Sequence, residues 1–164
     1  MPNPLRADLS RRWRLLPWLL LLCAAPLLQA QAPAPLDTYP RSTLEIRSSG
    51  GRHWLKVWIA STPAQQMQGL MFVRRLADDE GMLFPLAQPR IMDMWMKNTL
   101  IPLDMLFIDG KGRVACLRER TVPESLDLIS CDTPVKAVLE IAGGQAKMRG
   151  IGVGDTVVHA LLHE

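Results

Sequence analysis

The segment 95–104, with the sequence WMKNTLIPLD, carries the polar side chains of this chain that are best suited to chemistry. Asp104 lies between apolar residues in a strand-like stretch, so its carboxylate needs a hydrogen-bond donor or a cation as partner. We expect Lys97, or the backbone amides near Asn98, to supply it. In its simplest form this pattern predicts a structural clasp, because buried charged groups commonly hold a connection in place.

The same residues allow two functional interpretations. In the first they form a ligand pocket, in which Trp95 is an apolar wall. The polar atoms of Lys97, Asn98 and Asp104 would then bind the ligand. In the second, Asp104 and Lys97 act as the acid and base of a hydrolase. We expect binding rather than catalysis, because no nucleophile elbow or phosphate-loop signature is found in the sequence.

Methionine is concentrated in the middle of the chain. Seven of the nine methionines lie between Met67 and Met105. Met92, Met94 and Met96 alternate along the sequence, so they would share one face of a single strand. Thioethers suit Cu(I), which makes a metal site at these three residues an alternative hypothesis. Core packing is favoured because methionine commonly fills cores and no histidine lies near this triplet, so we predict no cofactor.

Two cysteines, Cys116 and Cys131, lie beyond the N-terminal segment. In an exported protein, a pair of this kind is expected to form a disulfide rather than a redox or metal site. Such a bond would close a loop of about 16 residues, which corresponds to roughly 3 kcal/mol of stabilisation in the chain-entropy model.

The positive net charge comes from the start of the chain. The whole sequence has 19 lysines and arginines against 16 acidic residues. Four of those arginines and one acid precede residue 31, which leaves 15 basic and 15 acidic residues in the remainder. Because this remainder has no formal excess of positive charge, we predict no nucleic-acid partner.

Residues 1–30 have the layout of a secretory signal peptide. Arginines precede an apolar stretch over 15–28, and small residues follow around Ala30. The apolar stretch is shorter than the roughly 20 residues of a membrane-spanning helix. We therefore expect export to the periplasm, by the general or the twin-arginine route, with membrane contact only through this segment before cleavage. An uncleaved N-terminal anchor is the alternative.

The rest of the chain predicts a proline- and alanine-rich linker over 31–42 and one β domain over 43–164. Short runs with apolar alternation are separated by glycine-containing turns, and no long helix is expected. This pattern indicates a mainly β fold, either a jelly-roll-like β-sandwich or a β-barrel, with one or two short helices. The expected strands are 44–47, 53–59, 81–84, 91–96, 103–108, 113–118, 135–141 and 155–161.

One helix is expected just after the second strand. Thr62 is a suitable N-cap, Pro63 suits the first helical position, and Gln65 completes a capping box. Gly69 can end the helix. A helix of this length would turn Met67, with Ala64, Leu70 and Met71, toward the core.

Five short motifs recur in a characteristic order: GLMF at 69–72, GMLF at 81–84, WMKNTLIPLD at 95–104, FID at 107–109, and VLE at 138–140 with Gly143. Over about residues 44–158, their order and spacing resemble the prokaryotic domain of unknown function family 192 (DUF192). The resemblance implies a compact, mostly β domain of sandwich or jelly-roll type, common among exported proteins, and it implies no activity.

From these observations we expect an exported module of the cell envelope that binds a small molecule or an envelope protein through the surface near WMKNTLIPLD. Hydrolase chemistry at Asp104 and Lys97, and Cu(I) binding by methionines, are the two alternatives.

Overall fold

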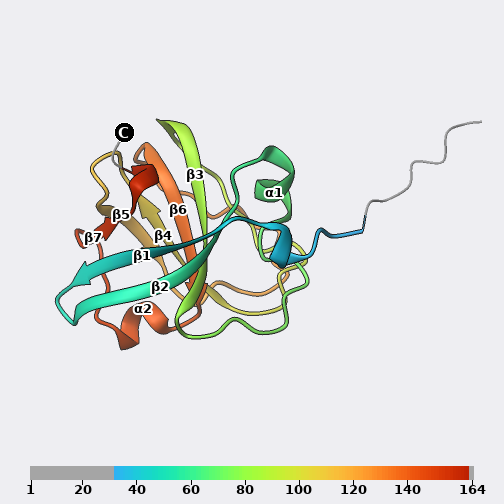
Figure 1. Ribbon diagram of the computed structural model, residues 1–164, viewed down its shortest axis with the longest axis horizontal. Helices are drawn as coiled ribbons and strands as arrows, with labels where there is room; N and C mark the ends of the chain where they lie inside the picture. The colour runs from blue at the N-terminus through green and yellow to red at the C-terminus, as the bar shows by residue number, and fades with distance from the viewer. Residues whose placement is uncertain (1–31, 163–164) are drawn as a thin grey trace, which may run out of the picture. The chain divides into compact units, whose positions relative to one another are not determined.

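The computed structural model describes residues 32–162, and the predicted signal segment lies outside them. Seven strands form one curled mixed sheet, in the order β5-β4-β6-β3-β2-β1-β7 (Figure 1). The mainly β prediction is confirmed, with one curled sheet, a half-barrel, as the architecture. The elements are β1 Arg41–Ser48, β2 Gly51–Ile59, α1 Pro63–Gln68, β3 Glu80–Arg90, β4 Leu103–Ile108, β5 Val114–Arg118, β6 Val135–Ala142, α2 Gln145–Met148 and β7 Thr156–Val158.

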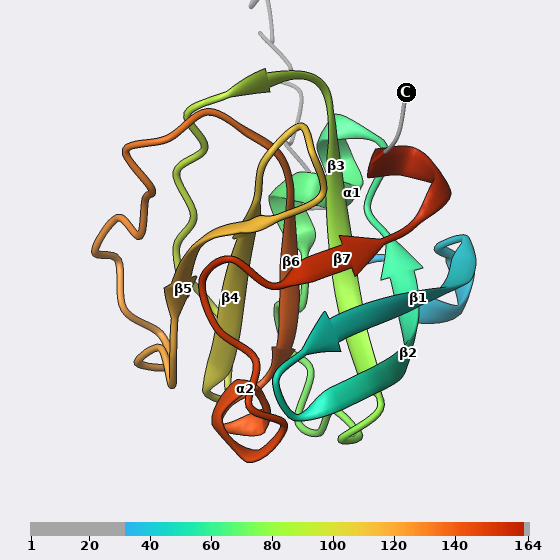
Figure 2. The ribbon, with the colours of Figure 1, turned by 90° about the vertical axis from the view of Figure 1, so that its left-hand side faces the viewer.

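The sheet curls until its two edge strands approach each other. Most neighbouring strands are antiparallel, and β2 and β3 run parallel because α1 and its flanking turns connect them. At the edges, an isolated bridge joins Arg113 to Thr156. The amide of Val114 also donates to the carbonyl of Asp155 at 2.9 Å. Figure 2 looks at this side, with β7 in front. These bonds protect strand edges that would otherwise be open to pairing.

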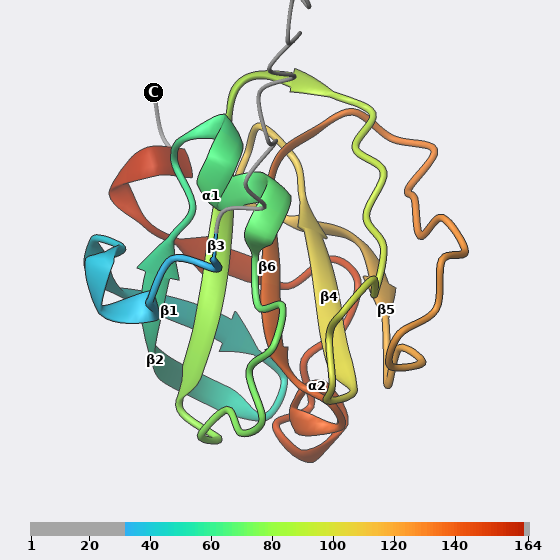
Figure 3. The ribbon, with the colours of Figure 1, turned by 90° about the vertical axis from the view of Figure 1, so that its right-hand side faces the viewer.

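Each face of the sheet has its own hydrophobic core. The inner core takes residues from every strand, such as Leu44, Leu106 and Val157. The outer core lies on the opposite face, around Phe84 and Met105. With no long helix available, this outer face is covered by α1 and by long connections (Figure 3).

The predicted strand over 91–96 is wrong. In this stretch Met94 alone pairs, through an isolated bridge to Ile129. The amide of Met96 donates to the carbonyl of Ser125 at 3.1 Å. The alternation that suggested a strand is nevertheless real, because Met94 and Met96 are buried while Trp95 is not. A period of two reports burial on one side of an extended chain and does not require sheet pairing.

The ends of the β domain also differ from expectation. β1 begins at Arg41, within the stretch predicted as linker. Just before it, Tyr39 is only 2% exposed and belongs to the outer core. At the other end, β7 stops at Val158 and a 3₁₀ helix, Ala160–Leu162, follows where strand was expected.

The disulfide between Cys116 and Cys131 is confirmed. Cys116 lies on β5, and Cys131 lies in the connection that leads to β6, with 5.9 Å between their Cα atoms. The bond therefore ties this connection to the edge of the sheet. The same connection supplies Ile129, the partner of Met94, so the disulfide also supports the cover of the outer face.

Asp104 is fully buried on β4 and holds three separate backbone segments together. Its carboxylate accepts hydrogen bonds from the amides of Arg120 at 2.8 Å and Ala146 at 2.8 Å. The amide of Gly144 donates to both carboxylate oxygens, at 2.9 and 2.8 Å. The expected hydrogen bonding is confirmed, but the donors are these amides and not Lys97 or the amides near Asn98.

Replacement of Asp104 by Asn should destabilise the fold. An amide side chain has one acceptor oxygen and places an N–H₂ group among amide donors, so buried N–H groups lose their partner. We expect the free energy of unfolding to fall by about 2–4 kcal/mol, measured by urea denaturation. Asp109→Asn is the control, since Asp109 accepts the amides of Lys111 and Arg113 in an exposed turn. Equal losses in the two variants would contradict a special role for Asp104.

Candidate functional site

The candidate site begins with the capping of α1. Thr62 accepts from the Gln65 amide, and the Gln65 side chain accepts in return from the Thr62 amide. Pro63 occupies the first helical position and Gly69 ends the helix with a φ of 50°. The predicted helix is therefore confirmed. Its predicted orientation is wrong for Ala64, which is exposed, and for Met67, which is 62% exposed, because the short helix lies across the rim of the outer core.

Polar contacts fix α1 on the sheet. The side-chain amide of Gln66 donates to the carbonyl of Ala60 at 3.1 Å and to the carbonyl of Pro85 at 2.9 Å. These two carbonyls lie just beyond β2 and within β3, so one side chain joins the helix to two strands. A helix of this length has little stability alone and depends on such contacts.

The turn after α1 contacts the WMKN segment directly. The Phe72 amide donates to the carbonyl of Asn98 at 2.8 Å, and the Asn98 side-chain amide lies 3.7 Å from the sulfur of Met71. Phe72 and Asn98 both have positive φ, at 65° and 56°. Two motifs that are distant in sequence are therefore joined directly.

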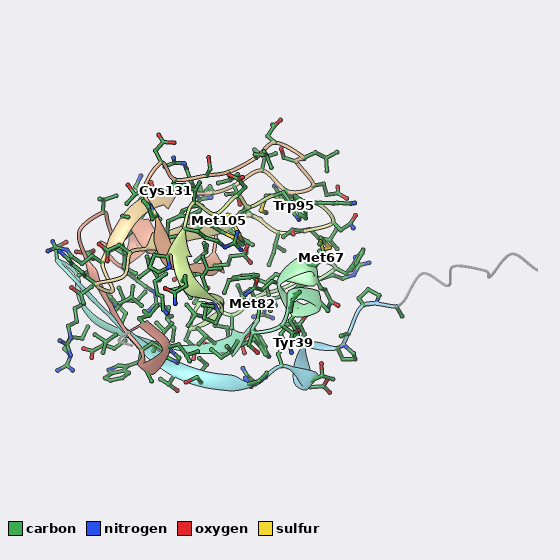
Figure 4. All side chains as sticks on the ribbon, turned by 90° about the horizontal axis from the view of Figure 1, so that it is seen from above. Tyr39, Met67, Met82, Trp95, Met105 and Cys131 are labelled. Carbon is green, nitrogen blue, oxygen red and sulfur yellow. A yellow bond between two sulfur atoms is a disulfide. The ribbon has the colours of Figure 1, made fainter. Side chains whose placement is uncertain are left out.

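A cleft of about 230 Å³ lies between α1 with its following turn and the connection that carries Trp95. Figure 4 shows Met67 and Trp95 on this side of the molecule, beyond Met82 and Met105. The walls are mainly apolar, with a few polar groups. They are formed by Pro63, Gln66, Met67, Gln68, Gly69, Leu70, Met71, Phe84, Met92, Asp93, Met94, Trp95, Thr99 and Glu140.

Glu140 is the buried ionisable residue that lines this cleft. It lies on β6 directly between Met82 of β3 and Met105 of β4, and directly opposed residues share a face of the sheet. Only 4% of the Glu140 surface is exposed. Its carboxyl forms no hydrogen bond or ion pair with any other residue in the range 32–162. A Cβ on Gly81 would lie 2.6 Å from the Glu140 carbonyl, so glycine allows β3 to approach here.

Burial alone raises the pKa of Glu140, from its ordinary value of 4.5 to about 8. Glu45 provides the contrast, because it is also buried but contacts Arg47 and Arg52. Hydrogen bonds from Arg52 and then from Arg47 lower the pKa of Glu45 to about 2. A buried carboxyl with arginine partners is stabilised as an anion, whereas the Glu140 carboxyl retains its proton at neutral pH.

Of the four residues predicted for a ligand site, Trp95 alone lines the cleft, with 41% of its surface exposed. Lys97 is exposed and Asn98 holds the turn after α1. Asp104 is committed to the three backbone amides described above. The structure therefore does not bring Asp104 and Lys97 together as an acid and base pair.

The methionine triplet is divided between two environments. Met92 and Met94 line the cleft. Met96 is fully buried, and its sulfur lies 3.1 Å from the hydroxyl of Thr121, which donates to it. Met67 and Met71 line the cleft as well, so four thioether side chains surround it.

Sequence reasoning did not select Glu140 as a site residue. The available signal was a carboxyl within the apolar strand sequence VKAVLEIA, in a motif quoted for the family resemblance. Lys136 in the same strand shows why that signal is ambiguous. Its ammonium group donates to the carbonyl of Ala87 at 3.2 Å and so has a structural partner.

Among residues 32–162, no group of three or more histidine, cysteine or acidic side chains could hold a metal ion. Within the same range, no helix combines the length and apolarity needed to cross a bilayer.

The described residues form a small, mainly β domain with a cleft above a buried carboxyl. The chain belongs to the DUF192 family, described as "Uncharacterized ACR", whose model matches residues 44–159. This confirms the resemblance seen in the sequence. None of the curated proteins matches the chain.

Solved structures similar to this chain include two crystal structures. One, from Sinorhizobium meliloti 1021, is provisionally described as a transcription regulator. It is 40% identical with a TM-score of 0.73, and the match covers 75% of this chain and 96% of the other. The second is a protein of unknown function from Novosphingobium aromaticivorans. It is 38% identical with a TM-score of 0.74, and the match covers 79% of this chain and 94% of the other.

The pKa of Glu140 predicts how stability depends on pH. The folded state keeps this proton up to about pH 8, whereas the unfolded chain releases it near pH 4.5. The stabilising contribution is therefore complete below pH 4.5 and is lost as the pH rises toward 8. We expect Glu140→Gln to remove this loss. From pH 5 to pH 8.5, the free energy of unfolding of the variant should rise by a few kcal/mol relative to that of wild type. Urea unfolding at both pH values measures this change. A constant difference between the two proteins would contradict the assignment.

Proposed function

We propose that this protein is an exported binding module of the cell envelope and that its ligand is a small molecule held in the cleft beside α1. The observation that carries the proposal is the carboxyl of Glu140, which is buried, faces the cleft and has no partner among the described residues. The Glu140 oxygens are open to the cleft, because the Tyr39 hydroxyl is the one fully buried side-chain polar atom without a partner among residues 32–162. A largely desolvated carboxyl without a partner still costs free energy unless something satisfies it. A ligand that donates to Glu140 would remove that cost.

The rest of the cleft suits the same role. Small-molecule sites are mostly apolar with a few well-placed polar groups, which is the composition found here. Trp95 offers a partly exposed aromatic surface at the rim. Gln66 and Thr99 add polar groups to the walls.

The envelope location is supported by the signal-like segment over 1–30 and by the disulfide, a bond that is typical of oxidising compartments. N-terminal sequencing of protein recovered from the periplasm tests it. Recovery of the protein in the cytoplasm with residues 1–30 intact would contradict it.

The other interpretations have less support. A hydrolase based on Asp104 and Lys97 would need both groups at one open site. Regulation of transcription through DNA, the role suggested for the Sinorhizobium relative, would require a basic surface, and residues 31–164 hold equal numbers of basic and acidic residues.

A fragment screen tests the binding function. We expect water-soluble fragments that bind to shift the backbone amide resonances of Met67, Trp95 and Glu140 in ¹H–¹⁵N NMR spectra of the protein, because these residues line the cleft. Trp95→Ala should weaken binding of the same fragments at least fivefold through loss of aromatic contact. Trp54→Ala is the matched control, since Trp54 is also exposed, at 57%, but lies outside the cleft lining. Fragments that bind elsewhere, or equal losses in both variants, would refute the proposal.

Cu(I) binding is the second candidate function, favoured by the four methionines that line the cleft. Thioethers are soft ligands, so a Cu(I) site here would use Met92 and Met94 together with Met67 and Met71. Titration of the protein with Cu(I) in the presence of a chromophoric competitor should then show uptake of about one equivalent. Met92→Leu should lower the affinity at least tenfold, whereas Met148→Leu, an exposed methionine outside the cleft lining, should not. No uptake would rule this function out.

A further inference from the structure

The ionisable residues that line the cleft are all acidic. Asp93 and Glu140 are its only ionisable lining residues within the described part of the chain, and no lysine, arginine or histidine lines it. Once Glu140 is ionised, two carboxylates with no basic residue in the lining would repel an anionic ligand and attract a cationic one.

Two basic residues on the neighbouring strands have partners. Three exposed basic residues close to the lining in sequence, Arg74, Arg75 and Lys97, do not line the cleft. Lys56 on β2 pairs with Asp79 at 3.0 Å. Arg41 on β1 pairs with Glu80 at 3.1 Å and stacks on Trp58. Both pairs involve the chain at the start of β3, away from the cleft lining.

Lys136 is the basic residue on the same strand as Glu140. It precedes Glu140 by four residues, which is about 13 Å along a β-strand. Its ammonium group donates to the carbonyl of Ala87, as described above. The protein therefore supplies no cation to the Glu140 carboxyl from β6, and α1 contributes no charged residue to the cleft lining.

The walls define what kind of cation would fit. A hydrated metal ion would find two carboxyl groups and mainly apolar side chains, which is a poor ligand set for a hard cation. An organic cation with an apolar body would instead contact the methionine side chains and Leu70, and could stack on Trp95. A cleft of about 230 Å³ suits a ligand with a small body.

We propose that the cleft binds a small organic cation, an ammonium group on a short aliphatic or aromatic body, with the ammonium group at Glu140 and the body against Trp95 and the methionines. This inference rests on the proposed function, since it names the ligand class of the same cleft. Binding ionises Glu140, whose proton passes to solvent, and forms an ion pair within the cleft. Asp93, at the exposed rim, adds attraction without being buried.

The pH dependence follows from this ionisation. The neutral form of Glu140 predominates below pH 8, so a cation must displace a proton there. Affinity for the ammonium group should therefore rise with pH and level off above pH 8, until the ligand itself loses its proton near pH 10.

The test uses three probes of the same length on the full-length protein. Pentylammonium, pentan-1-ol and pentanoate differ only in the polar group, and their binding is followed by shifts of the cleft amides in NMR spectra. At pH 8.5 we expect pentylammonium to bind at least tenfold more tightly than pentan-1-ol, with pentanoate weakest. At pH 6 the affinity for pentylammonium should fall at least tenfold, whereas that for pentan-1-ol should change less than twofold.

Two variants separate the carboxyl groups. Glu140→Gln should bring pentylammonium to within twofold of pentan-1-ol and abolish the pH dependence. Asp93→Asn should weaken pentylammonium by threefold or less and keep the pH dependence. If Asp93→Asn had the larger effect, the placement of the ammonium group at Glu140 would be refuted. The comparison of the three probes in the wild-type protein stands by itself if a variant fails to fold.

The outcomes distinguish this inference from the proposed function. Equal binding of pentylammonium and pentan-1-ol in the cleft would refute a cationic ligand and leave the binding function intact. Tighter binding of pentanoate would do the same. If no probe shifts the cleft amides while other fragments do, the cation inference is also refuted. Failure of both the probes and the fragment screen would refute the binding function itself.

Discussion

The structure depends on the burial of β6 on both faces. This strand lies between β3 and β4, and every residue from Val135 to Ile141 is buried. Curling of the sheet covers one face, since residues of all seven strands meet there. The other face has no long helix to cover it, so a two-turn helix and long connections must do so, fixed by contacts such as Phe72 with Asn98 and Met94 with Ile129. The cleft lies where this cover is incomplete, above Glu140.

Three buried carboxylates show how environment assigns different roles to one chemical group. Asp104 is surrounded by backbone amides and joins β4 to two distant segments. Glu45 is held by two arginines at the hairpin of β1 and β2. Glu140 has neither kind of partner within the described chain, and burial raises its pKa to about 8. Carboxylates with hydrogen-bond or ion-pair partners hold a fold together, whereas a carboxyl without a partner beside a cleft is a candidate functional group.

Separated motifs of this DUF192 protein meet at the cleft. The turn over 69–72, the segment around Trp95 and Glu140 on β6 are distant in sequence but adjacent in the fold. Met71 and Asn98 connect the first two, and Gly81 allows β3 to lie close against β6 beside the third. The family itself is uncharacterized, so the chemistry of this cleft is what gives its function a testable form.

The sequence by itself determined the features that depend on local pattern. The alternation of apolar residues predicted a mainly β fold, Thr62 and Gln65 predicted the capping of α1, and two cysteines predicted the disulfide. Only the tertiary structure decided which groups meet. Asp104 accepts hydrogen bonds from amides that lie 16 to 42 residues away in sequence. The stretch over 91–96 alternates in burial as predicted, but it is not a strand of the sheet. A period of two records which side chains are buried, but not what covers them. For that reason, the tertiary structure alone could distinguish the satisfied carboxyl of Asp104 from the unsatisfied carboxyl of Glu140.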